Sequence, residues 1–113
     1  MDKRTTKKLL REITKQVREL LGRKLRSVIL YGSYARGDYD SESDIDIMVL
    51  VDSDGNELRE TEKKVWKIGW DIGYEYNIVV TVFANNYDLF HSRTAWLPYY
   101  RNVANEGVPL YAT

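Results

Sequence analysis

The segment Gly32–Asp46 reads GSYARGDYDSESDID and separates two short runs of β-forming residues. Both runs, Ser27–Tyr31 before the segment and Ile45–Val51, which starts within its last two residues, are rich in Val, Ile and Leu, the composition of buried strands. The first run leads directly into Gly32, and the second begins directly after Asp44. We therefore expect a loop that joins two strands and carries polar groups at the end of one strand and at the mouth of the other.

Asp44 and Asp46 are predicted to lie on the same face of the second strand. Successive strand side chains alternate between faces, so residues two apart share a face at roughly 6.5–7 Å between Cα atoms, and Ile45 and Ile47 then point toward a core. Two neighbouring carboxylates repel each other and gain nothing from burial. Such a pair is often only surface alternation, but it also suits Mg²⁺, which takes further ligands from water and substrate phosphates. Two such ions about 3.5–4 Å apart are the usual device for phosphoryl or nucleotidyl transfer.

Gly32, Ser33 and Arg36 are candidates for binding phosphate. A glycine at the end of a buried strand allows a tight turn and the close approach of another group. Ser33 offers a hydroxyl and a backbone N–H, and a helix that begins there directs free N–H groups at an anion. Arg36, one turn further, can add a charge-assisted hydrogen bond. Gly-Ser alone is a common turn, but beside Asp44 and Asp46 it completes a minimal set of groups for using a nucleoside triphosphate.

The flanking sequence predicts an α/β (α+β) fold, in which helices pack against one small β-sheet. Gly22 and Gly107 are expected to end helices, Asn56 to cap one, and Asn85-Asn86 to end the third strand. We expect one domain over residues 1–113. Its predicted elements are a helix over about 5–21, strands over 27–31 and 45–51, a helix over about 57–76, a strand over 78–83 and a helix over about 94–105.

The composition is that of a globular protein and excludes several classes. Of the 113 residues, 43% are hydrophobic and 12% aromatic, which is too apolar for a disordered chain. Cysteine is absent, so disulfide scaffolds, thiolate zinc sites and cysteine nucleophiles are excluded. No apolar run approaches the roughly 20 residues of a membrane span, and the charged N-terminus lacks the apolar core of a signal peptide. We therefore expect a cytoplasmic protein with no membrane partner.

The 17 basic and 17 acidic residues give a net charge of zero, but the two signs are separated along the chain. Residues 1–26 are strongly basic and residues 38–62 strongly acidic. The basic residues surround an apolar helical stripe and are most simply a solvated helix face, so nucleic acid is not an expected partner. The acidic residues cluster around the loop that carries Asp44 and Asp46.

The combination of Gly32-Ser33, ten intervening residues and then Asp44 and Asp46, with Arg36 in between, resembles the DNA polymerase β-type nucleotidyltransferases. The short length matches their smallest branch, the minimal nucleotidyltransferases. The resemblance implies a mixed sheet flanked by helices, ATP or another nucleoside triphosphate as donor, and two Mg²⁺ ions. It also implies that Gly32 and Ser33 hold the triphosphate with help from Arg36, and that Asp44 and Asp46 bind metal and act in catalysis.

Minimal nucleotidyltransferases are often paired with a small helical HEPN-type protein in prokaryotic toxin–antitoxin systems. There they act as the antitoxin, and some transfer AMP to a tyrosine of the toxin. The resemblance therefore implies a Mg²⁺-dependent enzyme that moves a nucleoside monophosphate, AMP from ATP in the first instance, onto a hydroxyl of a partner protein.

The sequence departs from the family pattern at a third carboxylate, which the family carries on a neighbouring strand. The corresponding residues 77–83 include no acid on either face. Glu75 just before this strand, or Asp71 on the preceding helix, could substitute as a metal ligand. Without a third acid, one metal loses an anionic ligand and the attacking hydroxyl loses its nearest base. A second interpretation therefore stays open: a weak or inactive nucleotidyltransferase-fold module that masks a helical toxin.

Trp66 and Trp70 are four residues apart on the central predicted helix, offset from its apolar stripe. Their spacing is consistent with core residues and with an interface to a partner or to a second copy of the chain. Gly69 and Gly73, also four apart, would let another element approach the helix closely. The single histidine, His91, is interpreted as a loop or packing residue rather than as a base.

Overall fold

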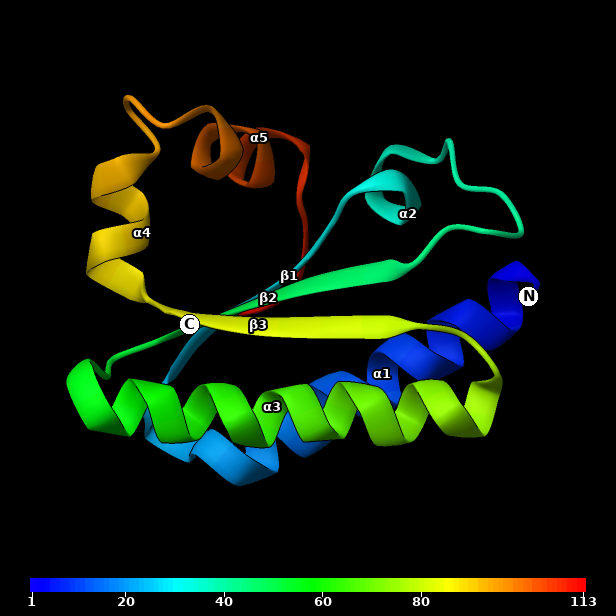
Figure 1. The fold of residues 1–113 in the computed structure, drawn as a ribbon, viewed down its shortest axis with the longest axis horizontal. Coiled ribbons are helices and arrows are strands. Elements are labelled where there is room, and N and C mark those ends of the chain that lie inside the picture. Colours follow the sequence, from blue (N-terminus) through cyan, green and yellow to red (C-terminus); the bar gives the residue numbers. More distant parts are fainter.

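A four-stranded β-sheet separates two layers of helices in the computed structural model, which describes residues 1–113 (Figure 1). The helices α1 and α3 lie below the sheet in Figure 1, and α2, α4 and α5 lie above it. In chain order the elements are α1 (Lys3–Leu21), the 3-10 turn η1 (Gly22–Lys24), β1 (Leu25–Tyr31), α2 (Ser33–Arg36), β2 (Ile45–Val51), α3 (Gly55–Tyr76), β3 (Val80–Asn86), α4 (Tyr87–Arg93), α5 (Pro98–Glu106) and β4 (Val108–Ala112).

The sheet is mixed, with the strand order β3-β2-β1-β4. β2 runs antiparallel to β1 and parallel to β3, and β4 runs antiparallel to β1. The prediction of a small mixed sheet flanked by helices is thus confirmed. In the strand register, Asp46 of β2 pairs with Tyr31 of β1 and with Thr81 of β3. Paired residues point to the same face of a sheet, so these three side chains lie together.

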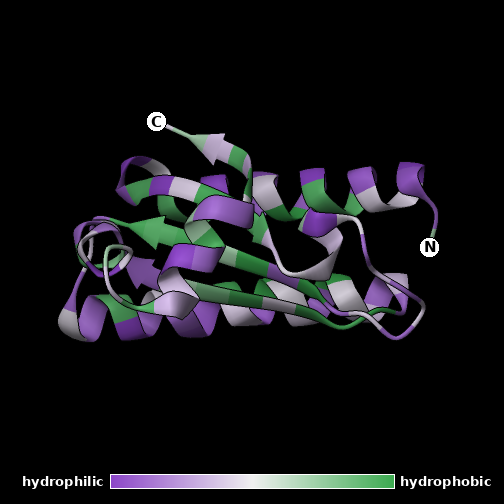
Figure 2. Ribbon diagram, turned by 90° about the horizontal axis from the view of Figure 1, so that it is seen from above, coloured by the Kyte–Doolittle hydropathy of each residue, from purple (hydrophilic) through white to green (hydrophobic).

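The main core lies between the sheet and the lower layer of helices and includes 15 buried residues. α1 contributes Leu9, Ile13 and Val17, which belong to its predicted apolar stripe and are fully buried. Because each helix buries only one side, hydrophobic and hydrophilic residues alternate along the helices, as the colours of Figure 2 show. None of these helices combines the length and the apolar character that crossing a bilayer requires.

α3 packs unusually close to β3, and two glycines make this approach possible. A Cβ added to Gly69 would lie 2.6 Å from Cγ2 of Val82 and 3.1 Å from the Val80 carbonyl oxygen. A Cβ added to Gly73 would lie 2.5 Å from the Ile78 carbonyl oxygen and 3.2 Å from the Val80 nitrogen. The predicted role of these glycines is confirmed, and β3 is the element that approaches.

A second, smaller core lies above the sheet under α4 and α5. Its four buried residues are Met48, Leu50, Phe90 and Val103. Along β2, the upper-face side chains therefore change from Leu50 and Met48 to Asp46, and Asp44 follows at the mouth of the strand. The apolar upper core ends where the acidic pair begins, whereas Ile45 and Ile47 are fully buried in the lower core as predicted.

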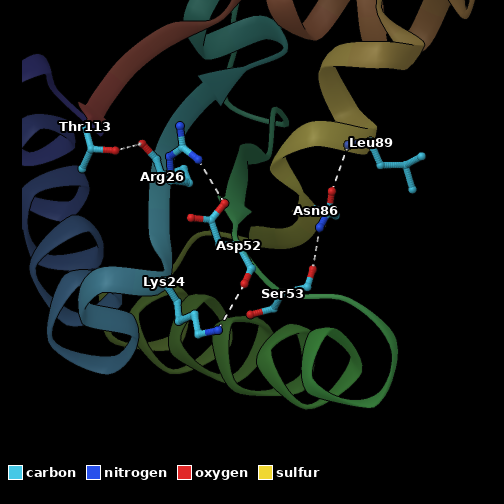
Figure 3. Close-up of polar contacts among 7 residues, drawn as sticks. All are labelled: Lys24, Arg26, Asp52, Ser53, Asn86, Leu89 and Thr113. Carbon is cyan, nitrogen blue, oxygen red and sulfur yellow. Dashed lines mark hydrogen bonds and ion pairs between the residues drawn. The ribbon is translucent and has the colours of Figure 1, made fainter.

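The third strand is shifted from the predicted 78–83 to Val80–Asn86. The expectation that Asn85-Asn86 would break it is wrong. β3 continues to Asn86 because the polar groups of both asparagines find tertiary partners. Nδ2 of Asn85 contacts Sδ of Met48 at 3.4 Å. Nδ2 of Asn86 donates to the Ser53 carbonyl at 2.9 Å, and its Oδ1 accepts from the Leu89 N–H, which caps α4 (Figure 3).

The helix boundaries differ from the sequence expectations at two places. α3 begins at Gly55 after Asp54, so Asn56 lies inside the first turn and is not the cap. The expected helix over about 94–105 is α5, which begins later, because Pro98 occupies its first turn. The short helix α4 before it was not predicted. The predicted end at Gly107 is confirmed.

β4 was not predicted, because its sequence VPLYA is short and contains Pro109. A proline cannot donate to a strand ladder and is tolerated mainly at sheet edges. β4 is indeed the edge strand beside β1, and the N–H of Thr113 donates to the Arg26 carbonyl at 3.1 Å. Figure 3 shows this end of the sheet, where Arg26 also forms an ion pair with Asp52 at 3.0 Å.

Candidate active site

Asp46 lies between the end of β1 and the start of β3 and contacts both. A Cβ placed on Gly32 would be 2.5 Å from Oδ2 of Asp46. On the opposite side, Oγ1 of Thr81 donates a hydrogen bond to Oδ1 of Asp46 at 2.8 Å. The structure therefore brings the glycine turn and the Asp46 carboxylate together, and Thr81 lies on the other side of this carboxylate.

Gly32 is required at its position for two reasons. Its φ is +75°, in the region that side chains other than glycine rarely adopt. The carboxylate of Asp46 also fills the space that a Cβ would need. The chain turns here from β1 into α2, and the turn stays in contact with the carboxylate.

Gly32→Ala is expected to destabilise the protein by about 2–4 kcal/mol, from roughly 1 kcal/mol of backbone strain and 1–3 kcal/mol of overpacking. Gly37→Ala is the matched control, since Gly37 has φ +87° but no atom within 4 Å of an added Cβ. Urea unfolding of both variants measures the difference. Equal losses of stability in the two variants would show that the contact with Asp46 is unimportant.

α2 begins directly after Gly32 and presents free N–H groups near the Asp46 carboxylate. The Gly32 carbonyl accepts from the N–H groups of Ala35 and Arg36, both at 3.1 Å. The first N–H groups of such a turn, here those of Ser33 and Tyr34, have no intrahelical acceptor. They are donors that an anion next to Asp46 can use, and Ser33 adds its hydroxyl.

The electrostatic environment of Asp46 disfavours its charged form. Burial raises the pKa of the Asp46 carboxyl, and the neighbouring charge of Asp44 raises this pKa further. The hydrogen bond from Thr81 and the charge of Arg36 lower the same pKa, but they do not outweigh burial. A cation between the two carboxylates would remove the repulsion that now raises this pKa.

The donor set fits one divalent cation better than two. Asp44 is exposed and Asp46 half-buried. Mg²⁺ is commonly held by one or two carboxylates plus substrate phosphates. No group of three or more Asp, Glu, His or Cys side chains in the chain could hold a metal ion. A second ion would need a third carboxylate as a ligand, and the residue at that place beside Asp46 is Thr81, which offers only a hydroxyl.

Neither substitute considered for the third acid joins the site. Glu75 and Asp71 lie on α3, which packs against the lower face of the sheet, whereas Asp46 points to the upper face. Glu75 is exposed, and Asp71 pairs with Lys67 at 2.6 Å. Thr81 takes the position beside Asp46 instead. Its sequence signal is that it is the single polar residue in the run Ile78–Phe83.

Arg36 lies close to the site, but two carboxylates already engage it. Its Nε is 3.2 Å from Oδ2 of Asp38, and its Nη1 is 3.2 Å from Oε2 of Glu106. Both partners raise the pKa of the guanidinium, which stays charged. A phosphate bound here would compete with Asp38 and Glu106. Sequence reasoning missed Glu106, because only the tertiary fold brings the end of α5 to this loop.

Tyrosines surround the site, and none is placed to act as a base. The Tyr31 hydroxyl is 3.0 Å from that of Tyr99, and burial raises the pKa of Tyr31 strongly, so it stays protonated. Tyr34 and Tyr39 stack at 4.2 Å between ring centroids and hold the loop against α2. His91 packs against the ring of Tyr87 on α4, in agreement with its interpretation as a packing residue.

The mixed sheet, with an acidic pair on an inner strand beside a glycine turn, is typical of enzymes that act on nucleoside phosphates. The chain belongs to the nucleotidyltransferase domain family, whose sequence model matches residues 10–108. Two proteins of Methanocaldococcus jannaschii, MJ0604 and MJ0141, which are provisionally named protein adenylyltransferases, are similar over nearly their whole length. MJ0604 is 32% identical over 104 residues, which cover 92% of this chain and 96% of that protein. MJ0141 is 35% identical over 100 residues, which cover 88% and 93%.

Solved structures share the fold of this chain. A provisionally named nucleotidyltransferase of Sulfolobus solfataricus matches with a TM-score of 0.59 and 21% identity, covering 93% of this chain and 78% of the other. A chain in the complex of a tri-AMPylated HEPN toxin of Shewanella oneidensis with its MNT antitoxin matches with a TM-score of 0.57 and 22% identity, covering 95% and 72%. At 21–22% sequence identity, this similarity shows a shared fold and nothing more.

Proposed function

We propose that the chain is a Mg²⁺-dependent nucleotidyltransferase that moves AMP from ATP onto a hydroxyl of a partner protein. The observation that carries this proposal is the contact between the Gly32 turn and the Asp46 carboxylate, whose pKa is raised by burial and by the charge of nearby Asp44. This arrangement puts phosphate-binding N–H groups next to the two carboxylates that suit a divalent cation.

Each residue of the proposed site has its own role in the transfer. Ser33 and the free N–H groups of α2 bind the triphosphate, and Asp44 and Asp46 would hold Mg²⁺, which supplies charge stabilisation at the phosphate oxygens. The acceptor oxygen forms a bond to the α-phosphorus as the bond to the bridging β-phosphate oxygen breaks, and pyrophosphate leaves. The hydroxyl proton passes to water, since no carboxylate lies in the third position. Thr81 holds the Asp46 carboxylate in place by its hydrogen bond.

A protein is the favoured acceptor because the similar proteins point to one. MJ0604 and MJ0141 carry names that state protein adenylyltransferase activity. The similar Shewanella oneidensis complex holds an AMPylated HEPN toxin together with an MNT antitoxin. We propose a HEPN-type protein as the partner of this chain, and ATP as the donor.

One observation favours a second function, a module that masks a helical toxin without modifying it. Thr81 replaces the third carboxylate, and no other acid joins Asp44 and Asp46. A site without that acid lacks both a metal ligand and a base, which lowers the rate of transfer.

The two functions are separated by mixing the chain with Mg²⁺, ATP labelled at the α-phosphate and the product of the adjacent gene, which is the candidate for the proposed HEPN-type partner. We expect label on the partner, no label from ATP labelled at the γ-phosphate, and none when Asp44 and Asp46 are both replaced by Asn. Asp52→Asn, at the far end of β2, is the matched control and should label normally. A tight complex that never acquires label would support the masking module and refute the transfer.

A further inference from the structure

An exposed aromatic stripe runs along α3. Trp66, Trp70 and Tyr74 are spaced four residues apart, so they lie on one face of the helix. Their exposed fractions are 42%, 59% and 87%. α3 and β3 run alongside each other on the near side of the molecule in Figure 1. Trp66 reaches around the outer side of β3 to Phe83, with 5.7 Å between ring centroids.

The stripe ends at a hollow that reaches Asp44. The hollow has a volume of about 720 Å³ and lies between the loop before β2, the end of α3 and the start of β3. Trp70, Tyr74 and Val79 line its apolar side, and Asp44 lines its other side. Val79 pairs with the residue between the two acids, because its carbonyl accepts from the Ile45 N–H at 3.0 Å.

The direction of the reaction assigns this hollow to the acceptor. In an in-line displacement the attacking oxygen and the leaving pyrophosphate lie on opposite sides of the transferred phosphorus. Gly32 and Ser33, the proposed triphosphate site, lie on the β1 side of Asp46, and Thr81 lies on the β3 side. The acceptor oxygen therefore enters from the β3 side. The surface that borders this entrance is the hollow with Val79, Trp70 and Tyr74.

The charges of the hollow indicate what kind of segment it accepts. Its lining includes Glu42 and Asp44 but no Lys or Arg. The loop beside it adds Asp40, which accepts a hydrogen bond from the Glu42 N–H. Aromatic side chains with acidic neighbours match a partner surface that is apolar and carries basic residues.

We propose that Trp70, Tyr74, Val79 and Glu42 form the docking surface for the acceptor protein, which presents its hydroxyl on an apolar segment flanked by Lys or Arg. This proposal rests on the proposed function, since it locates the partner of the same reaction. Trp66 extends the surface along α3.

The test uses the double variant Trp70→Ala/Tyr74→Ala, whose side chains are both more than half exposed, so the fold is retained. With the HEPN-type neighbour as acceptor, we expect its KM to rise about 10- to 100-fold, the size typical of an interface hot spot, while kcat and the Kd for ATP change less than about twofold. Trp96→Ala is the matched control, because Trp96 is 65% exposed but lies between α4 and α5. It should leave all three constants unchanged.

The outcomes separate this proposal from the proposed function. If the wild-type chain binds the partner without labelling it, transfer is refuted, and the Kd of the complex by calorimetry still tests the surface. An unchanged KM and Kd in the double variant overturns the docking surface, while label on the partner upholds transfer. Dissociation of a dimer of this chain by the same variant in sedimentation, with partner binding intact, assigns the stripe to a second copy and also overturns the proposal. A wild-type chain that neither binds nor labels the partner refutes both.

Discussion

Asp46→Asn is expected to lower the rate of nucleotidyl transfer by about 10³-fold or more, while it raises the free energy of unfolding at neutral pH. The loss of rate follows because the amide cannot provide the negative charge that a divalent cation needs, a contribution of several kcal/mol. The gain in stability follows from the position of Asp46, where burial and Asp44 oppose ionisation. We expect roughly 0.5–1 kcal/mol, of the order found when a functional group that is costly to the fold is removed.

The gain in stability of Asp46→Asn should depend on pH, and the pKa of Asp46 gives the sign of this dependence. The pKa of Asp46 is higher in the folded protein than in the unfolded chain. Its stabilising contribution is therefore complete below the unfolded-state pKa and is lost as the pH rises through the folded-state pKa. Asp46→Asn removes this titration, so the advantage of the variant should be largest at pH 7 and vanish near pH 3–4.

Urea unfolding between pH 3 and pH 8 measures the effect without any ligand. Asp52→Asn is the control, since Asp52 forms an ion pair with Arg26 and should give no gain in stability. Parallel stability curves for the wild type and Asp46→Asn would contradict the electrostatic description of the site, whatever the effect on transfer.

Thr81→Asp is expected to raise the rate of transfer by about 10²-fold. Thr81 lies on β3 beside Asp46, with its Oγ1 2.8 Å from the carboxylate, so an aspartate there would supply the third carboxylate. It would add an anionic metal ligand and a base for the attacking hydroxyl, and general bases typically contribute 10²–10⁴-fold. Without metal the new charge should destabilise the fold, and Mg²⁺ should restore the stability by binding.

Thr81→Asn controls for size without charge and should give no gain in rate. Single-turnover labelling of the partner measures the rate, and the melting temperature with and without Mg²⁺ measures the metal dependence. A rate for Thr81→Asp no faster than that of Thr81→Asn would show that the third acid is not what limits this site. Activity that appears only in Thr81→Asp would favour the masking module for the natural chain.

Local sequence patterns predicted much of the fold. β2 was predicted over its observed bounds 45–51. The centre of the predicted stripe of α1 is buried at Leu9, Ile13 and Val17, because periodicity follows from burial on one side, whereas Leu20 near its end is exposed. The prediction that the asparagines end β3 was wrong because the side chain of Asn86 has two hydrogen-bond partners that its local sequence does not reveal. These partners are the carbonyl of Ser53, which is distant in the sequence, and the N–H of Leu89 in α4. β4 was missed because an edge strand with Pro109 has no local strand signal.

The candidate site was predictable where it depends on neighbouring residues in sequence. The strand alternation and the glycine turn predicted that Asp46 lies near Gly32, and the two residues are in contact. The place of Asp44 in the site and the chemical roles of these residues stay predictions. The exclusion of Glu75 could not be foreseen, because it depends on which face of the sheet α3 covers. The engagement of Arg36 by Glu106 depends in the same way on where α5 ends.

The close packing of α3 at Gly69 and Gly73 has a consequence for self-association. The outward backbone groups of Val80 are covered by the helix, and Val80, Val82 and Ala84 are at most 2% exposed. Of the two edge strands of the sheet, β3 is thus covered at these residues and β4 is open to pairing. Pairing of sheets from two molecules can occur only at β4, which leaves no free margin for a third. Strand pairing alone therefore cannot extend native molecules into a fibre.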